Sequence, residues 1–337
     1  MNVKRVFIIL SVIILLANVF ALTSCSRSYT AEGFALGTFY TVKSSKRLDP
    51  KAIQDILDSV ENKFSVSVTT SDIFRINNSV TGEWIEVSED TGFLLNAAFD
   101  FALTDNAVNA FNPAVFPLVA LWGFAPPYLE LMEKTPPREE DITAVLAYCD
   151  ISNFIIEGNS VKRLNENAAL DLGGIAKGYA ADKIADYLIE SGAKRALINL
   201  GGTLISIGKN SVIGIAPPRD SNYSYIASFT LSEGFACATS GDYERYYIND
   251  GVRYHHIIGK DGYPADSDII SATIICDSGK NADAMSTMVF VEGSAKGIEL
   301  IRANAAKGIL VTRDNIIIAV DIEVKIKDSG YTLTIAE

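Results

Sequence analysis

The sequence has few histidines and cysteines, and it lacks the best-known nucleotide-binding signatures. Two of its 337 residues are histidine and four are cysteine. It contains neither a P-loop nor the Gly-x-Gly-x-x-Gly fingerprint of dinucleotide-binding folds. Ser240 has no Gly-x-Ser-x-Gly frame around it, so it is not expected to be a hydrolase nucleophile. These absences argue against P-loop, Rossmann-type and serine-hydrolase chemistry.

Positive charge and paired cysteines are also scarce. Lysine and arginine number 29 against 41 acidic residues, a net charge of −12 that argues against nucleic acid as a partner. Cys149, Cys237 and Cys276 lie far apart, and none belongs to a Cys-x-x-Cys pair. We expect these three to be small buried hydrophobic residues, not a disulfide framework or a zinc site.

The N-terminal segment has the features of an export signal. Lys4 and Arg5 precede an apolar run over residues 6–22, and Cys25 follows three residues later. The ending Leu-Thr-Ser-Cys resembles a bacterial lipobox, in which the cysteine is lipidated; an uncleaved signal anchor is the alternative. The sequence therefore predicts a signal peptide over 1–25, lipidation of Cys25, a tether over 26–33 and a folded domain over 34–337. This organisation places a membrane-anchored lipoprotein on the extracytoplasmic face.

Apolar periodicity and turn residues predict an α+β fold, with mixed or antiparallel sheets and flanking helices. Helices are expected at 50–60, 92–103, 139–149 and 282–292, and another before Gly192 with Ala180, Ile184, Tyr187 and Leu188 on one face. Strands are expected at 39–42, 168–172, 196–200, 204–207, 212–216, 225–231, 243–249, 253–258, 272–276, 308–311, 316–320 and 324–326. Asp250-Gly251 between two of these strands indicates a short hairpin.

Residues 171–178 read Asp-Leu-Gly-Gly-Ile-Ala-Lys-Gly, between the expected strand and helix. A glycine-bracketed turn that enters a helix presents free N–H groups and a positive dipole end, which favour a phosphate. Glycines needed only for close packing are the alternative, and the segment alone does not separate the two. Gly192 is expected to end the helix.

Two further patterns carry chemistry. Asp283 and Thr287 are four residues apart in a helical stretch, so a carboxylate and a hydroxyl share one face and could hold Mg²⁺. An ordinary acid and threonine near a helix start are the alternative. His255 and His256, expected in a strand, point to opposite faces, so at most one can face a given site.

The order of these patterns along the chain resembles the ApbE family of flavin transferases (FAD:protein FMN transferases), whose architecture is T-fold-related. The matching blocks lie at 35–38, 111–113, 117–118, 121–124, 170–178, 198–202, 238–245, 256–258, 262–264 and 283–287. The resemblance implies that the protein binds FAD with Mg²⁺, passes the FMN half to a threonine of an acceptor protein and releases AMP. It also implies an acceptor that is an extracytoplasmic subunit of a membrane respiratory complex, such as a sodium-pumping one.

The resemblance assigns roles to particular residues. His256 would be the general base that takes the acceptor hydroxyl's proton. The implied Mg²⁺ ligands are Gly174 (through its carbonyl), Asp283, Ser286 and Thr287. The implied contacts with FAD are Leu36, Asn109, Ala110, Phe111, Asp171, Lys177 and Ile258.

The chain departs from the family pattern at three places. Ser67 stands where many members place a tyrosine against the flavin, which keeps simple FAD hydrolysis open as an alternative activity. The segment after Ile258 is shorter than usual, and Asn112 and Ala114 replace a usual Asp and Thr. A non-catalytic flavin-binding lipoprotein is a further alternative.

Overall fold

A computed structural model describes residues 28–104, 107, 109–125 and 135–336. Its centre is a nine-stranded sheet in the order β1-β2-β6-β7-β10-β13-β14-β15-β17, which is antiparallel except where β15 pairs with β17. Its strands are β1 (Tyr29–Ala35), β2 (Thr38–Ser44), β6 (Ala196–Leu200), β7 (Thr203–Ile207), β10 (Ala236–Gly241), β13 (Ile269–Cys276), β14 (Lys307–Thr312), β15 (Ile316–Val320) and β17 (Thr332–Ile335).

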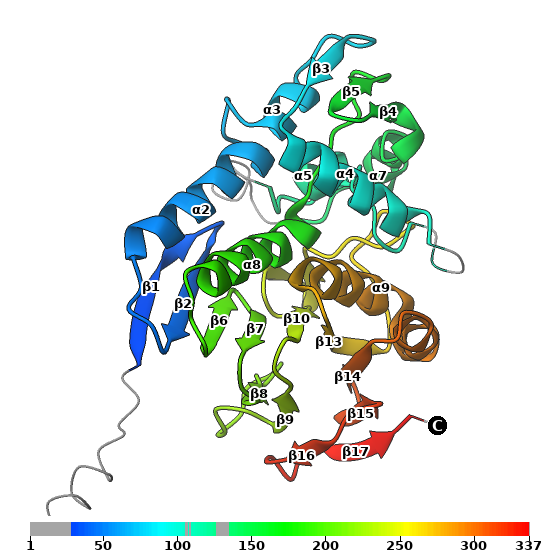
Figure 1. Cartoon of the computed structure of the whole chain (residues 1–337). Coiled ribbons are helices and arrows are strands. Elements are labelled where there is room, and N and C mark those ends of the chain that lie inside the picture. Colours follow the sequence, from blue (N-terminus) through cyan, green and yellow to red (C-terminus); the bar gives the residue numbers. More distant parts are fainter. Residues whose placement is uncertain (1–27, 105–106, 108, 126–134, 337) are drawn as a thin grey trace, which may run out of the picture.

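Helices and a second sheet cover the two faces of this sheet. Helices α8 (Gly173–Glu190) and α9 (Gly279–Ala303) lie side by side on one face, and α2 (Pro50–Phe64) packs beside α8 (Figure 1). On the other face, β8 (Ser211–Ile215), β9 (Ala227–Leu231) and β16 (Val324–Ile326) form a three-stranded sheet. Residues such as Phe229 and Ile309 fill the core between the two sheets. The result is the expected α+β architecture, in three layers.

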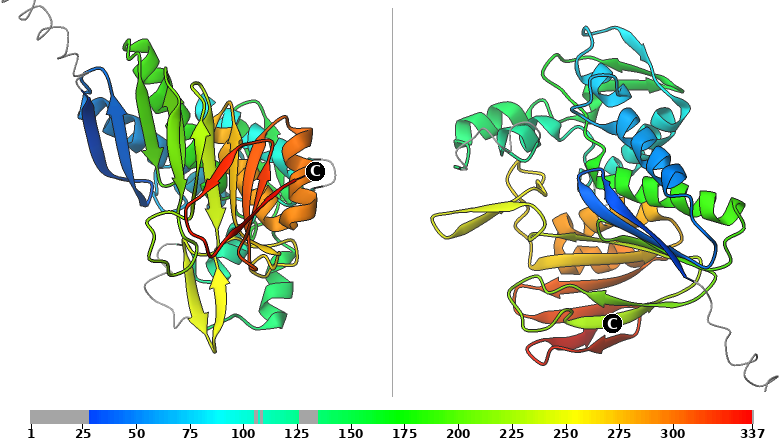
Figure 2. Two further views of the ribbon diagram at one scale, coloured as in Figure 1. Left: turned by 90° about the horizontal axis from the view of Figure 1, so that it is seen from below. Right: turned by 90° about the vertical axis from the view of Figure 1, so that its left-hand side faces the viewer.

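Smaller elements sit beyond the helix layer (Figure 2). They are α3 (Asp72–Asn77), β3 (Trp84–Glu86), α4 (Glu89–Ala102), α5 (Phe116–Leu121), α7 (Glu139–Leu146), the 3₁₀ turn η1 (Ile151–Asn153), β4 (Phe154–Glu157) and β5 (Ser160–Arg163). Strands β3, β5 and β4 form a small antiparallel sheet. A separate hairpin joins β11 (Tyr246–Asn249) to β12 (Val252–His255).

Local sequence sets the ends of several helices. Asp49 caps α2 by accepting from the Lys51 amide, and Pro50 occupies the first helical position. Gly192, at φ +85°, ends α8 as expected, because a residue without Cβ takes the left-handed conformation without strain. The hairpin at Asp250-Gly251 is also confirmed, with both turn residues at positive φ.

Two expectations about local structure are wrong. Residues 168–172 form no strand. Their apolar side chains enter the core, but their backbone forms hydrogen bonds with a loop and with a side chain instead of with a neighbouring strand. The expected tether over 26–33 is too long, since Tyr29–Ala35 is a strand paired along its whole length with β2. The expected signal peptide and Cys25 lie outside the described residues.

Cys149, Cys237 and Cys276 are free and buried, as expected from the sequence. Burial raises the pKa of each thiol, that of Cys237 to about 12, so these side chains are inert. In the described ranges, no helix is long and apolar enough to cross a membrane.

Candidate functional site

The site is built where α8 and α9 cross at a pair of glycines. A Cβ on Gly178 would lie 2.1 Å from the Gly279 carbonyl oxygen, and one on Gly279 would lie 2.7 Å from that of Gly178. Asp182 ties the same crossing together by accepting from the amides of Gly279 (2.7 Å) and Lys280 (2.9 Å) at the start of α9. Close packing of the two helices therefore explains why residue 178 is a glycine.

This crossing brings Asp283 of α9 against the first turns of α8. The Asp283 side chain is almost fully buried; its Oδ2 accepts from the Gly178 amide at 2.9 Å, and Lys177 Nζ lies 3.6 Å from its Oδ1. Burial raises the pKa of Asp283, while Lys177 and the Gly178 amide oppose that rise. The carboxylate is thus held in place by two groups of the glycine-rich segment.

Hydroxyl groups gather beside this carboxylate. The Ser286 hydroxyl donates its hydrogen to the Asp283 carbonyl oxygen at 2.8 Å. Its oxygen also lies 2.7 Å from the hydroxyl oxygen of Ser240 in β10. Because the Ser286 hydrogen is already used, Ser240 is the donor in this second hydrogen bond. Ser240 also lies 3.3 Å from Thr287 Oγ1. Thr287 faces α8, because a Cβ built on Gly174 would lie 3.6 Å from that hydroxyl. The expected common face of Asp283 and Thr287 is confirmed.

The donor set of this cluster suits a hard cation. It offers one carboxylate (Asp283), two hydroxyls (Ser286 and Thr287) and the carbonyl of Gly174, all oxygen donors of the kind that Mg²⁺ prefers. The Gly178 amide, which a regular helix directs toward the Gly174 carbonyl, donates to Asp283 Oδ2 at 2.9 Å. No group of three or more His, Cys, Asp or Glu side chains gathers among the described residues.

The segment before α8 is held by hydrogen bonds that replace strand pairing. Asn77 donates to the Leu170 carbonyl at 2.9 Å and accepts from the Leu170 amide at 2.7 Å. The Asp171 amide donates to the Pro113 carbonyl at 2.8 Å. These contacts fix the backbone that presents Asp171 at the entrance to α8.

The positive charges of Arg245 and Lys177 act on Asp171. Its Oδ1 accepts from the Gly173 amide at 2.7 Å. Burial raises its pKa, and the Gly173 amide and the charges of Arg245 and Lys177 oppose that rise. Asp171, Lys177 and Arg245 therefore share one electrostatic environment.

The expected flavin contacts at 109–111 border α8. Phe111 is buried, and a Cβ built on Gly174 would lie 2.9 Å from its ring. Ala110 is buried beside it, whereas Asn109 is exposed at φ +59°, in the left-handed region that asparagine tolerates best among side-chain-bearing residues. The departure at Asn112 has a local reason, since its amide donates to the Cys149 carbonyl and its oxygen accepts from Ala114.

His256 follows directly after β12 and bonds to Arg245, the residue just before β11. Its Nδ1 lies 3.3 Å from the Arg245 carbonyl oxygen, which can only accept, so Nδ1 carries the proton of the neutral ring. Burial, aided by the charges of Arg245, His255 and Lys177, lowers the pKa of His256 to about 3. The ring is therefore neutral, with its free lone pair on Nε2.

The neighbouring His255 has a structural role. It is buried, its Nε2 donates to the Ala265 carbonyl at 3.2 Å, and its Nδ1 accepts from the Ile257 amide at 3.3 Å. Its ring also meets Phe290 edge-on at 5.4 Å between centroids. The two histidines therefore diverge as expected, and His256 alone keeps a free nitrogen.

The remaining expected residues lie on turns. Leu36 and Gly37 form the turn between β1 and β2, at φ +52° and +71°, and a Cβ on Gly37 would lie 3.3 Å from Arg245 Nη2. Ile258 makes a single β-bridge with Pro264. Ser67 is exposed after α2, and its hydroxyl is 3.1 Å from that of Ser65; no hydrogen bond in the described ranges connects it with the other expected residues.

Sequence reasoning missed four residues of this arrangement, namely Asn77, Asp182, Ser240 and Arg245. Asp182 and Asn77 act through backbone groups about one hundred residues away, and no spacing rule reveals such partners. Arg245 and Ser240 lie within a block that matched the family, and that position was the only available signal.

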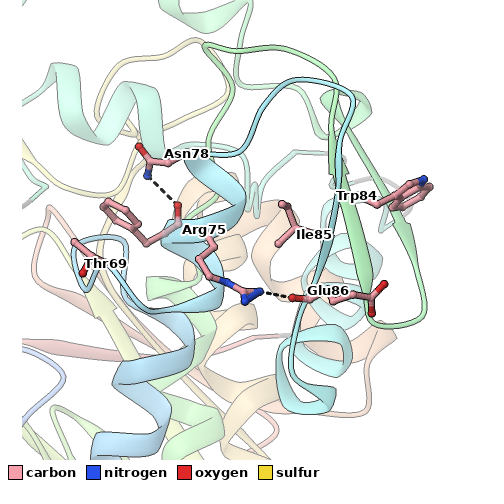
Figure 3. Close-up of a pocket in the computed structure, with 7 residues that line it drawn as sticks. Thr69, Arg75, Asn78, Trp84, Ile85 and Glu86 are labelled. Atoms are coloured by element: carbon pink, nitrogen blue, oxygen red, sulfur yellow. Dashed lines mark hydrogen bonds between the residues drawn. The ribbon is translucent and has the colours of Figure 1, made fainter.

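A surface hollow of about 460 Å³ lies elsewhere, between α3 and β3 (Figure 3). Arg75 reaches across it to donate to the Glu86 carbonyl, and the exposed Trp84 stands at its edge. None of its lining residues belongs to the cluster around Asp283 and His256. We therefore locate the chemistry by the clustered side chains and not by this hollow.

Comparison with known proteins agrees with this geometry. The model of the ApbE family matches residues 36–310, most of the chain. The chain belongs to the ApbE family. Within it, the FAD:protein FMN transferase of Vibrio cholerae serotype O1 (strain ATCC 39541 / Classical Ogawa 395 / O395) is 30% identical over 89% of this chain and 93% of that protein. The FAD:protein FMN transferase of Klebsiella pneumoniae (strain 342) is 32% identical over 82% of this chain and 87% of that protein.

Solved ApbE structures share the fold. The ApbE protein of Thermotoga maritima has a TM-score of 0.75 at 33% identity, covering 90% of this chain and 98% of the other. The flavin transferase ApbE of Vibrio cholerae has a TM-score of 0.76 at 28% identity, with the same coverage. The family and the α+β architecture expected from the sequence are both confirmed.

Proposed function

We propose that this chain transfers the FMN half of FAD to a threonine hydroxyl of an acceptor protein and releases AMP. The observation that carries the proposal is His256, a neutral histidine whose Nδ1 is committed to Arg245 and whose Nε2 is free to accept a proton. The names of the relatives support the same reaction.

The reaction is a phosphoryl-type transfer, which depends on positioning and charge neutralisation. The threonine oxygen bonds to the phosphorus of the FMN phosphate, and the bond from that phosphorus to the AMP oxygen breaks. The threonine proton goes to His256 Nε2, and AMP leaves with the electron pair. Lys177 and Arg245, whose charges act on this site, would stabilise the negative charge of the pyrophosphate.

We also propose Mg²⁺ as the cofactor, held by Asp283, Thr287, Ser286 and the Gly174 carbonyl. Bound there, the ion would neutralise charge on the pyrophosphate oxygens. The oxygen-only donor set and the buried, anchored carboxylate of Asp283 support this assignment.

The proposed setting is the extracytoplasmic face of a membrane. The lipobox-like Cys25 and the apolar run before it support lipidation and a lipid anchor. An acceptor that is an extracytoplasmic subunit of a membrane respiratory complex would meet the enzyme there.

The test uses the chain without residues 1–25, FAD and Mg²⁺, with and without a threonine-containing acceptor peptide. AMP, free FMN and peptide mass are measured. AMP together with a peptide heavier by one FMN supports the transferase. FAD that is bound but unconverted contradicts it.

AMP with free FMN and an unmodified peptide favours a second candidate, an FAD pyrophosphatase that uses water as acceptor. Ser67 is the observation that favours this candidate, because its small side chain cannot stack on a flavin ring as the family's usual tyrosine does.

A further inference from the structure

The β11–β12 hairpin projects beyond the end of the central sheet (both views of Figure 2). Arg245 precedes its first strand, and His256 follows its second. The two ends are tied, because the His256 amide donates to the Arg245 carbonyl at 3.1 Å. A chain segment bound along this hairpin would therefore extend toward His256.

One face of the hairpin is fixed to the protein. Tyr247 and Tyr254 are cross-strand partners whose rings stack at 5.3 Å. Tyr247 also stacks on Phe124 at 5.7 Å, and Tyr254 on Trp122 at 5.5 Å. Four stacked rings hold the hairpin in one orientation. A partner that binds its other face therefore loses little free energy to ordering the hairpin.

The other face exposes apolar surface that the described residues leave uncovered. Tyr246 is 41% exposed and Ile248 is 60% exposed, on the same side of β11. Arg253, the partner of Ile248, lies over the Tyr246 ring at 3.7 Å. An aromatic ring, an aliphatic side chain and an arginine form the kind of patch that binds another protein.

The backbone of β11 is also available on this side. The turn has two residues, so the flanking pair Asn249 and Val252 exchanges both ladder hydrogen bonds. Hydrogen-bonded and non-hydrogen-bonded pairs alternate, which turns the N–H and C=O groups of Tyr246 and Ile248 outward. Such an edge can accept an added strand.

We propose that the outer edge of β11, with Tyr246 and Ile248, is the docking surface for the threonine-bearing segment of the acceptor protein, which adds as an extended strand. The inference rests on the proposed function, because only a protein acceptor needs such a surface. The threonine-bearing segment is the expected occupant because this edge of the hairpin leads directly to His256, the proposed base. A strand of about four residues laid along β11 spans roughly 13 Å and reaches the Arg245–His256 end of the hairpin.

The test separates docking from chemistry by using two acceptors. The first is water, measured as AMP release from FAD without protein. The second is a soluble extracytoplasmic domain of a sodium-pumping respiratory complex subunit, the acceptor class that the family resemblance implies. The variants are Ile248→Asp, which places a charge on the patch, and Ile248→Pro, which removes the outward N–H while sparing the β11–β12 ladder. The control is Val212→Asp, a 77% exposed apolar residue of β8.

We expect both Ile248 variants to raise the KM for the protein acceptor at least tenfold and to leave AMP release with water unchanged, and the control to change neither. A photo-crosslinking residue at position 248, but not at 212, should capture the acceptor domain. Wild-type KM values in both Ile248 variants, or no crosslink at 248, would overturn the docking proposal alone. If the wild-type chain releases AMP but modifies no protein acceptor, the transferase proposal fails, and the docking proposal fails with it.

Discussion

His256 Nδ1 lies 3.3 Å from the carbonyl oxygen of Arg245, so the backbone of one residue selects the tautomer of the other. The arginine's guanidinium charge has a separate effect, because it disfavours a second proton on the ring. Arg245 thus fixes the tautomer of His256 through its carbonyl, while its charge keeps the ring neutral and lowers the basicity of Nε2.

The first prediction concerns pH. With the pKa of His256 lowered to about 3 by burial and by the charges of Arg245, His255 and Lys177, the ring stays neutral as pH falls through 6.5. We expect kcat/KM to show no loss between about pH 8 and pH 5, a range in which an ordinary histidine of pKa about 6.5 would be protonated. A profile that halves near pH 6.5 would contradict the prediction.

Arg245→Met should raise the pKa of His256, because a positive charge is removed while the backbone carbonyl stays. With only two histidines in the chain, NMR titration of the ring protons resolves both directly. The matched control is Arg195→Met, at an exposed arginine just before β6, which should leave both titrations unchanged.

Removing the Asp283 charge tests the metal site. Asp283→Asn keeps an oxygen acceptor for the Gly178 amide but removes the only carboxylate among the proposed ligands. We expect Mg²⁺-dependent AMP release to fall by about 100-fold or more, equivalent to about 3 kcal/mol of transition-state stabilisation, with little change in melting temperature. Asp277→Asn, at an exposed acid nearby, is the control; full activity in Asp283→Asn would remove the metal assignment.

Ser67→Tyr tests the missing flavin stack. Ser67 is exposed, so a ring can be added there without entering the core. We expect tighter FAD binding and slower hydrolysis in the absence of acceptor, since offset stacking contributes about 0.5–1.5 kcal/mol. FAD fluorescence quenching measures the affinity and AMP release the rate; Ser67→Ala should resemble the wild type, and no change in either quantity for the tyrosine would remove this explanation.

Gly178→Ala tests the helix crossing. The new methyl group would lie 2.1 Å from the Gly279 carbonyl oxygen, a backbone atom that cannot move aside alone. We expect a loss of about 2–3 kcal/mol in the free energy of unfolding, measured by urea denaturation. Gly330→Ala, whose nearest neighbour is a flexible aspartate side chain at 3.2 Å, should be tolerated; equal stability of the two variants would show that the crossing can relax.

Much of the fold follows from local sequence. The bounds of β6, β15 and β16 coincide with the expected ones, because short apolar runs rich in β-branched residues and bounded by turn residues favour strands. Helix α2 begins at its Pro50, and α8 ends before its Gly192, for equally local reasons. The segment 168–172 shows the limit of this reasoning, since its apolar residues indicate burial but do not reveal that Asn77 takes the place of a strand partner.

The sequence by itself determined the family, the helix that carries both Asp283 and Thr287, and the divergence of the two histidines. These properties depend on residue order and on the periodicities of helix and strand. Only the tertiary structure decided that Gly178 donates to Asp283, that Arg245 sets the tautomer of His256, and that the β11 edge faces outward beside them. The first two are hydrogen bonds between residues separated in the chain, and the third is the exposure of a strand edge. All three arise only when the α8–α9 crossing and the hairpin pack into place.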